Sequence, residues 1–174
     1  RARELGVSFR GAGTSAHLED LVVSETLGFA SDGTLGLGVV VSGGAGLELA
    51  RAVLERNHLA GLNAGEADTT VVATDLVVRD TEAQPDGSAG QALFIGGGAS
   101  LEVRRAVLER DRGAEAAAYG AGSTLRLEDC VLRDTRPRAS DGGMGAGAAA
   151  TEGGVVNLRR VAIVRVAAAG IVVD

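Results

Sequence analysis

The segment LELARAVLERN, residues 47–57, recurs twice along the chain. It reads LEVRRAVLERD at 101–111 and VNLRRVAIVRV at 156–166. A second motif lies between these copies, reading VVATDLVVRDT at 71–81 and LRLEDCVLRDT at 125–135, with an earlier copy, AHLEDLVVSET, at 16–26. Because recurrence at such a spacing is typical of repeat architectures, the chain is a repeat of two alternating forms. We call the LELARAVLERN type form a and the VVATDLVVRDT type form b.

The units begin at residues 16, 47, 71, 101, 125 and 156, so one unit spans 24 to 31 residues. Within a unit, apolar residues such as Leu47 and Leu49 alternate with polar ones, and Leu54 follows after a short break. This alternation predicts β-strands. A second apolar run bounded by glycine, such as 39–41, predicts another strand in each unit, and glycine pairs supply the turns.

The composition favours thin, regular layers. The chain has 174 residues, of which 45% are hydrophobic but only 2% aromatic, with 27 glycines. A helix over ARAVLER (50–56) is an alternative, but two apolar stripes and a glycine corner leave little room for it. The leucine-rich repeat is the alternative solenoid, but its LxxLxLxxN signature is absent. The pattern predicts an all-β parallel solenoid of about six to seven coils, with residues 1–174 forming one segment of a longer chain.

These motifs resemble those of right-handed parallel β-helix proteins of the pectate-lyase-like type. Their coils read apolar-x-apolar, a polar corner, apolar, then x-x-Asn, and Leu47, Leu49, Leu54 and Asn57 fit this order. The Gly-Gly-Ala tract at 43–45 is also similar to that of polymorphic outer-membrane and autotransporter passenger proteins, with Leu54 in place of their Phe. The resemblance implies a right-handed β-helix, an extracellular or bacterial cell-surface location, and a non-catalytic structural or adhesive role.

A carbohydrate-active enzyme fragment, either a polysaccharide lyase or a glycoside hydrolase, is the alternative function. Such enzymes gather carboxylates at the scissile bond. In this chain an arginine coil separates every two acidic coils, so Asp80 and Asp134 should lie about 10 Å apart with Arg110 between them. We therefore expect no catalytic residue here, and we expect His17 and His58 to be surface histidines. The enzyme alternative places catalysis outside this segment or in the loops at 27–36, 82–90 and 136–147.

Charged residues of opposite sign alternate at equivalent positions of successive coils. Three columns do so: Asp20, Arg51, Asp75, Arg105, Asp129 and Arg160; Glu25, Arg56, Asp80, Arg110, Asp134 and Arg165; and Glu55, Arg79, Glu109 and Arg133. Equivalent residues of stacked coils are about 4.8 Å apart, so a column of one sign would be unfavourable. The columns predict salt-bridge ladders that set coil register, rather than a binding surface for a charged polymer.

The three long units share an Asp-Gly insertion at 31–33, 85–87 and 140–142. These loops should project from the same corner, two coils or roughly 10 Å apart. Binding sites often lie on such stacked loops, so Asp32, Asp86 and Asp141 are candidate ligand-binding residues. Turn formation by Asp-Gly is the alternative explanation for all three.

Composition excludes several other functions. The net charge of −6 argues against nucleic acid as a partner, and the absence of lysine excludes Schiff-base chemistry. Cys130 lies in an apolar column, which predicts a buried, inert thiol. We expect no membrane-spanning segment, no metal and no cofactor, because no uncharged apolar run reaches 18 residues and the lone Gly-rich tract at 43–49 lacks tandem calcium-binding copies. The expected partners are an extracellular polysaccharide or surface partner, and flanking coils or a second copy at the open ends.

Overall fold

The computed structural model describes residues 2–143 and 145–174, and the elements within them are all β-strands. One sheet contains, in spatial order, β1 (Leu5–Arg10), β4 (Leu37–Ser42), β6 (Ala60–Gly65), β8 (Gln91–Gly96), β10 (Ala114–Tyr119), β13 (Ala146–Thr151) and β16 (Ile171–Val173). The other contains β2 (Ser15–Glu19), β3 (Val22–Ser24), β5 (Gly46–Glu55), β7 (Thr70–Arg79), β9 (Ser100–Glu109), β11 (Thr124–Glu128), β12 (Val131–Arg133), β14 (Val155–Arg159) and β15 (Ala162–Val164). All pairings between these strands are parallel. The prediction of an all-β chain with parallel strands is confirmed.

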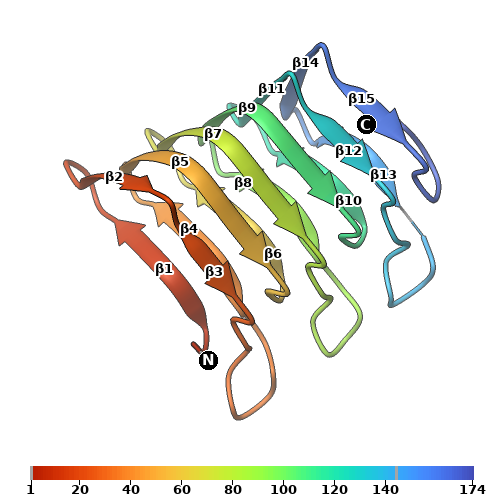
Figure 1. Cartoon of the computed structure of the whole chain (residues 1–174), viewed down its shortest axis with the longest axis horizontal. Helices are drawn as coiled ribbons and strands as arrows, with labels where there is room; N and C mark the ends of the chain where they lie inside the picture. Colours follow the sequence, from red (N-terminus) through yellow and green to blue (C-terminus); the bar gives the residue numbers. More distant parts are fainter. Residues whose placement is uncertain (1, 144) are drawn as a thin grey trace.

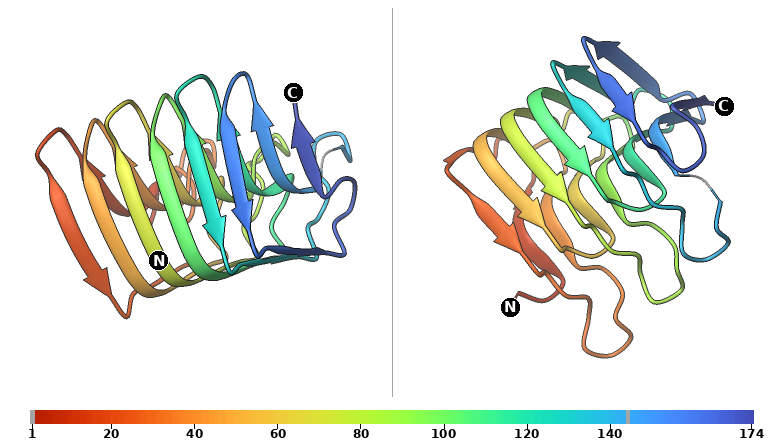
Figure 2. Two further views of the ribbon diagram at one scale, coloured as in Figure 1. Left: turned by 90° about the horizontal axis from the view of Figure 1, so that it is seen from above. Right: turned by 45° about the vertical axis from the view of Figure 1, so that its right-hand side comes forward.

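The chain visits the two separate sheets in turn, so that neighbouring strands of a sheet come from successive circuits (Figures 1 and 2). The observed register agrees with the alignment of forms a and b. Val71 pairs with Leu47 on one side and Leu101 on the other, and Leu101 pairs with Leu125. Equivalent residues of the repeat therefore form continuous columns along the long axis of the molecule.

The core lies between the sheets and consists of small and medium-sized aliphatic side chains. Leu47, Leu49, Ala52 and Leu54 are at most 3% exposed, while the residues between them are exposed or half-buried. The helix alternative for residues 50–56 is wrong, because residues 50–55 belong to the strand β5. Packing of the apolar face against the opposite sheet overrides the helix propensity of Ala and Arg.

Bends at charged residues divide the long strands into two halves. Arg51, Asp75 and Arg105 lie within β5, β7 and β9 and have φ angles of 52°, 54° and 53°. All twelve residues of the first two charge columns have φ between 50° and 60°. This left-handed conformation is uncommon for residues other than glycine. The sequence predicted a polar corner at these positions but gave no sign of their left-handed backbone.

A buried polar column runs beside the second set of bends. It consists of Thr26, Asn57, Thr81, Asp111 and Thr135, none more than 4% exposed. The Oδ1 atom of Asn57 accepts a hydrogen bond of 3.1 Å from the backbone N–H of Thr26, and its Nδ2 donates to the carbonyl oxygen of Val23. The side chain thus satisfies backbone groups of the preceding circuit at the bend.

Candidate functional site

The charged corners form discrete pairs across neighbouring circuits. Arg105 donates from Nε and Nη2 to the carboxylate of Asp75, both at 2.7 Å, and Arg110 binds Asp80 in the same bidentate way. In these two columns each arginine of form a binds the acid of the form b circuit before it. The predicted charge pairing is present, but as separate pairs and not as evenly spaced ladders.

The third column joins each circuit of form a to the circuit of form b that follows it. Glu109 of form a accepts ion pairs of 2.6 Å from Arg133 in the next circuit and from Arg110 in its own. Its side chain is only 8% exposed. Burial acts to raise the pKa of Glu109, but hydrogen bonds from Arg133 and Arg110 outweigh it and hold the pKa below its usual range. Together the three columns tie every pair of successive circuits between residues 16 and 165, at least once.

The candidate ligand-binding residues Asp32, Asp86 and Asp141 are all exposed, and each is engaged within its own loop. Asp32 accepts hydrogen bonds from the backbone N–H and the hydroxyl of Thr34, at 2.9 and 2.8 Å. Asp86 accepts from the N–H of Ser88 and Asp141 from that of Gly143, each at 2.8 Å. These contacts are Asx turns.

The three loops project from one side of the molecule, as expected (Figure 1). The tips of neighbouring loops are in contact, which is closer than the separation of two coils that the repeat spacing predicts. The N–H of Ser140 donates a hydrogen bond of 2.9 Å to the carbonyl oxygen of Gly87, and a Cβ atom on Gly33 would lie 2.8 Å from Cγ of Pro85. The loops therefore form a continuous ridge. Residue 144, within the expected 136–147 loop, lies outside the described residues.

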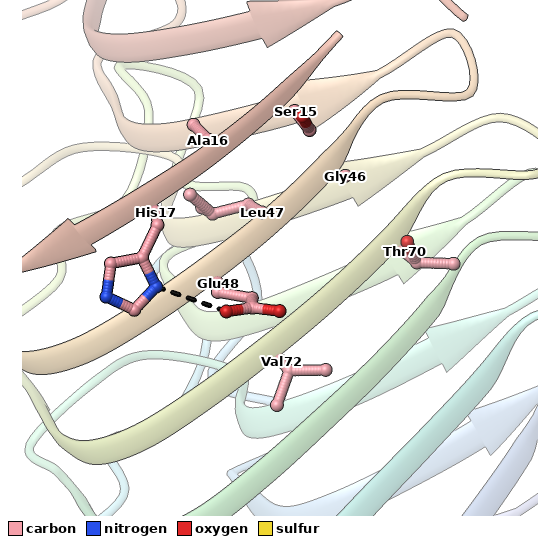
Figure 3. A pocket seen from close by; sticks show the side chains of 8 residues that line it. All are labelled: Ser15, Ala16, His17, Gly46, Leu47, Glu48, Thr70 and Val72. Atoms are coloured by element: carbon pink, nitrogen blue, oxygen red, sulfur yellow. Dashed lines mark hydrogen bonds and ion pairs between the residues drawn. The ribbon is translucent and has the colours of Figure 1, made fainter. Parts of the chain in front are cut away.

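A shallow groove of about 350 Å³ lies on the outer face of the second sheet, across β2, β5 and β7 (Figure 3). His17 lies beside it, with Nδ1 at 3.1 Å from Oε2 of Glu48 and Nε2 at 2.9 Å from Oε1 of Glu19. Hydrogen bonds first to Glu19 and then to Glu48 raise the pKa of His17. Because both ring nitrogens are engaged by carboxylates, His17 has no nitrogen free to act as a general base for Ser15. His58 lines a different hollow, beside the loops.

A second groove, of about 420 Å³, crosses β9, β11 and β14. Glu128 forms ion pairs there with Arg159 at 3.2 Å and Arg160 at 2.5 Å, and Arg104 pairs with Glu102. Arg126 is exposed between these strands and, among the described residues, has no ion-pair partner. Its guanidinium group is therefore available to an anionic ligand. The sequence alone does not distinguish Arg126 from the other arginines, because only the register shows that it lies beside Glu102 and Asn157.

An acidic pair lies inside the protein. Glu115 on β10 is completely buried, in a column otherwise occupied by small residues: its neighbours across the sheet are Ala92 and Gly147. The hydroxyl of Thr135 donates a hydrogen bond of 2.8 Å to Oε1 of Glu115, and the Glu115 side chain lies beside that of Asp111. Oε2 of Glu115 and Oδ2 of Asp111 are buried without a partner, and two ionised carboxylates have no donor between them, so a hydrogen bond that satisfies this pair requires a shared proton. Burial, with the charge of Asp111, raises the pKa of Glu115, and burial raises that of Asp111. Glu115 is thus kept protonated at neutral pH.

Glu115 was missed by the sequence analysis, although one signal was available. The segment AEAAAY, residues 114–119, places a single acid in an alanine run where the other circuits have Gly38, Gly61 and Ala92. The remaining sequence expectation concerned Cys130. It is 1% exposed and lies in the core, so its predicted burial is confirmed, and burial raises the pKa of its thiol.

Comparisons with known proteins yield no relative. No family model matches the chain, and neither a curated protein nor a solved structure matches it. Within residues 2–143 and 145–174, no three His, Cys, Asp or Glu side chains are grouped as a metal site. The same residues contain no helix long and apolar enough to cross a membrane.

Proposed function

We propose that the chain is a rigid structural or adhesive module of a secreted or cell-surface protein, built as a right-handed parallel β-helix. The observation that carries the proposal is that the charged side chains of successive circuits form ion pairs with each other. Side chains committed to such pairs are not available to a substrate. Each circuit is connected to its neighbours by backbone pairing, by a continuous core and by ion pairs. Contacts of this kind between all successive circuits are typical of a stiff solenoid.

The adhesive part of the proposal rests on the groove across β9, β11 and β14. Arg126 forms no ion pair there among the described residues, and it lies in a polar, open surface on which an extended chain could lie. A guanidinium group pairs well with carboxylates. An acidic polysaccharide is therefore the ligand class that this groove fits. The extracellular location is supported by the resemblance of the Gly-Gly-Ala and Leu54–Asn57 motifs to those of passenger proteins.

Incubation with polygalacturonate and other acidic polysaccharides tests both parts. We expect retention on the immobilised polymer, weakened by Arg126→Gln, with no release of unsaturated or reducing ends. Arg138→Gln, which removes an arginine paired with Asp141 at the loop ridge, is the matched control and should leave retention unchanged. Release of oligosaccharide products would instead support the carbohydrate-active enzyme alternative. Absence of retention would remove the adhesive role and leave the structural one.

A further inference from the structure

The outer face of the first sheet differs in charge from that of the second. In the described chain, the strands β4, β6, β8, β10 and β13 contain one charged residue, Glu115, and its side chain is buried in the core. The second sheet instead presents His17, Glu102 and Arg126 at its grooves. A charged ligand would meet no opposite charge on these strands of the first sheet, so this face is suited to a neutral partner.

One amide and one aromatic ring lie side by side on this face. Asn63 on β6 and Phe94 on β8 are direct partners across the first sheet. The residues on either side of Phe94, Leu93 and Ile95, are fully buried in the core, as are those on either side of Asn63, so both side chains point outward. The other members of their column from β4 to β13 are smaller aliphatic residues: Val40, Ala117 and Ala149.

Gln91 adds a second amide beside the ring. Ala92 and Leu93 both belong to the core, so Gln91 and Phe94 both lie on the outer face of β8, and each is half-buried. Within residues 2–143 and 145–174, the side-chain amides of Asn63 and Gln91 have no hydrogen-bond partner. Each amide therefore offers a carbonyl oxygen and two N–H donors to a ligand.

These three side chains line a hollow of about 130 Å³ beside the end of the 82–90 loop. Its other lining residues are apolar: Leu59, Ala60 and Ala89. Phe94 packs against two separate apolar clusters of the outer face, one toward β4 and β6 and one toward β10 and β13, so its ring is held in place. The hollow thus combines a fixed aromatic ring with two free amides and no charged group.

We propose that this hollow binds one uncharged pyranose unit of a glycan, with the ring of Phe94 against the C–H face of the sugar and the amides of Asn63 and Gln91 bonded to its hydroxyl groups. A neutral sugar has an apolar face and several hydroxyls that donate and accept, so it matches an aromatic ring beside amides. A purely apolar ligand would leave both amides without partners, and an ionised ligand would lose hydration without gaining an opposite charge. The site lies on the sheet opposite the Arg126 groove, and it goes beyond the proposed function.

Saturation-transfer NMR with four neutral hexasaccharides, namely malto-, cello-, laminari- and mannohexaose, tests the proposal. Methyl protons of the protein are irradiated, so the source of saturation is retained when a phenylalanine is replaced. We expect transfer from the wild-type chain to at least one of the four sugars. Phe94→Leu keeps an apolar side chain but removes the ring, and it should lower the affinity about tenfold. The matched control Phe29→Leu alters a half-buried phenylalanine of a different hollow and should bind like the wild type.

The two amides are tested with residues that other circuits already have at the same positions. Asn63→Val matches Val40, and Gln91→Ala matches Ala60, so both variants should keep the fold. Each should lower the affinity roughly three- to tenfold, because one or more hydrogen bonds to the sugar are lost. Arg126→Gln should leave the affinity for the neutral sugar unchanged, which separates this site from the groove on the second sheet.

Several results would overturn the proposal. One is the absence of transfer to all four neutral sugars, and another is an unchanged affinity in Phe94→Leu. Competition by hexagalacturonate would contradict the choice of a neutral ligand. A wild-type dimer that Phe94→Leu dissociates in sedimentation velocity would assign the hollow to a contact between two copies. Circular dichroism of each variant verifies the β-rich fold, and the two amide variants decide the question if Phe94→Leu does not fold.

Discussion

Arg105 donates two hydrogen bonds of 2.7 Å to the carboxylate of Asp75, which lies thirty residues earlier in the chain. Both residues occupy left-handed corners, with φ of 53° and 54°. Because the two corners share one backbone geometry, the side chains leave equivalent points of adjacent circuits and meet in a planar, bidentate pair. The hydrogen bonds from Arg105 are the main cause that lowers the pKa of Asp75, and the positive charge of Arg51 on its other side lowers it further.

Reversing one member of this pair should disturb two neighbours. Arg105→Glu places three acids, at 75, 105 and 129, in one column. We expect a lower Tm at low ionic strength and a smaller loss at high salt, since salt screens exposed charges. Thermal melts at about 0.02 M and about 0.5 M salt measure the difference. An unchanged Tm at low salt would mean that the column has no role in stability.

Exchanging the pair separates the contact from the alternation. The double variant Asp75→Arg, Arg105→Asp restores the contact but sets the introduced arginine beside Arg51 and the introduced aspartate beside Asp129. We expect only partial recovery of the Tm lost by Arg105→Glu, because the new like-charge neighbours oppose the restored pair. Complete recovery would show that the isolated pair is sufficient and that the two-form repeat has another cause.

The most enclosed ion pair should contribute more than the exposed ones. Glu109→Gln removes the carboxylate that Arg110 and Arg133 share, and we expect a loss of about 1–3 kcal/mol in the free energy of unfolding. Glu102→Gln, which alters a more accessible acid, 30% exposed and paired with Arg104 on the same strand, is the control, with an expected loss below about 0.5 kcal/mol. Urea denaturation measures both. Equal losses would contradict the importance of burial at Glu109.

Much of the fold could be predicted from the repeat itself. Alternation at Leu47 and Leu49 predicted strands, and aligning the units predicted their register, because a stacked repeat must place equivalent residues side by side. The charge columns followed from the same alignment. The left-handed backbone at the corners did not follow from the alignment. Arginine and aspartate alternate there, as at Arg51 and Asp75, so no single residue type indicates the bend. The contact between the loops depends on backbone turn geometry at Gly87 and Ser140, which spacing alone does not define.

The candidate site was less predictable than the fold. Asp32 and its counterparts were correctly placed on loops of one side, but their hydrogen bonds to nearby backbone groups depend on local turn geometry. Arg126 is a candidate because it forms no ion pair among the described residues, and this can be recognised only when the positions of all neighbouring charges are known. Glu115 shows the same limit: its partner Asp111 precedes a turn, and only the fold brings both carboxyl groups into the core.

The Asp-Gly loops should be dispensable for folding. The N–H of Gln84 donates to the carbonyl oxygen of Ser88 at 2.9 Å, so the ends of this segment already lie close together. Excision of residues 84–88 should therefore leave a β-rich circular dichroism spectrum and a cooperative melt, because the loop lies outside the core. The same excision removes the contact between Gly87 and Ser140, so proteolysis of the loop that contains Ser140 should become faster. Loss of the cooperative melt would assign the loop a structural role.

The buried acidic pair should make the protein less stable as the pH rises. Burial raises the pKa of Glu115 in the folded state, so above the ordinary glutamate pKa of about 4.3 the folded chain keeps a proton that the unfolded chain has released. Stability is then fully present below that pH and falls as the pH rises toward the folded value, by at most about 1.4 kcal/mol per pH unit.

Glu115→Gln cannot ionise, and its amide N–H can donate to Asp111 in place of the shared proton. We expect this variant to have a flatter profile between about pH 5 and about pH 8 and to exceed the wild type in stability at the upper end. Urea denaturation across this range measures the slopes, with Glu66→Gln, an exposed acid, as the control that keeps the wild-type slope. Parallel profiles for Glu115→Gln and the wild type would show that Glu115 is ionised in the fold and that no proton is shared with Asp111.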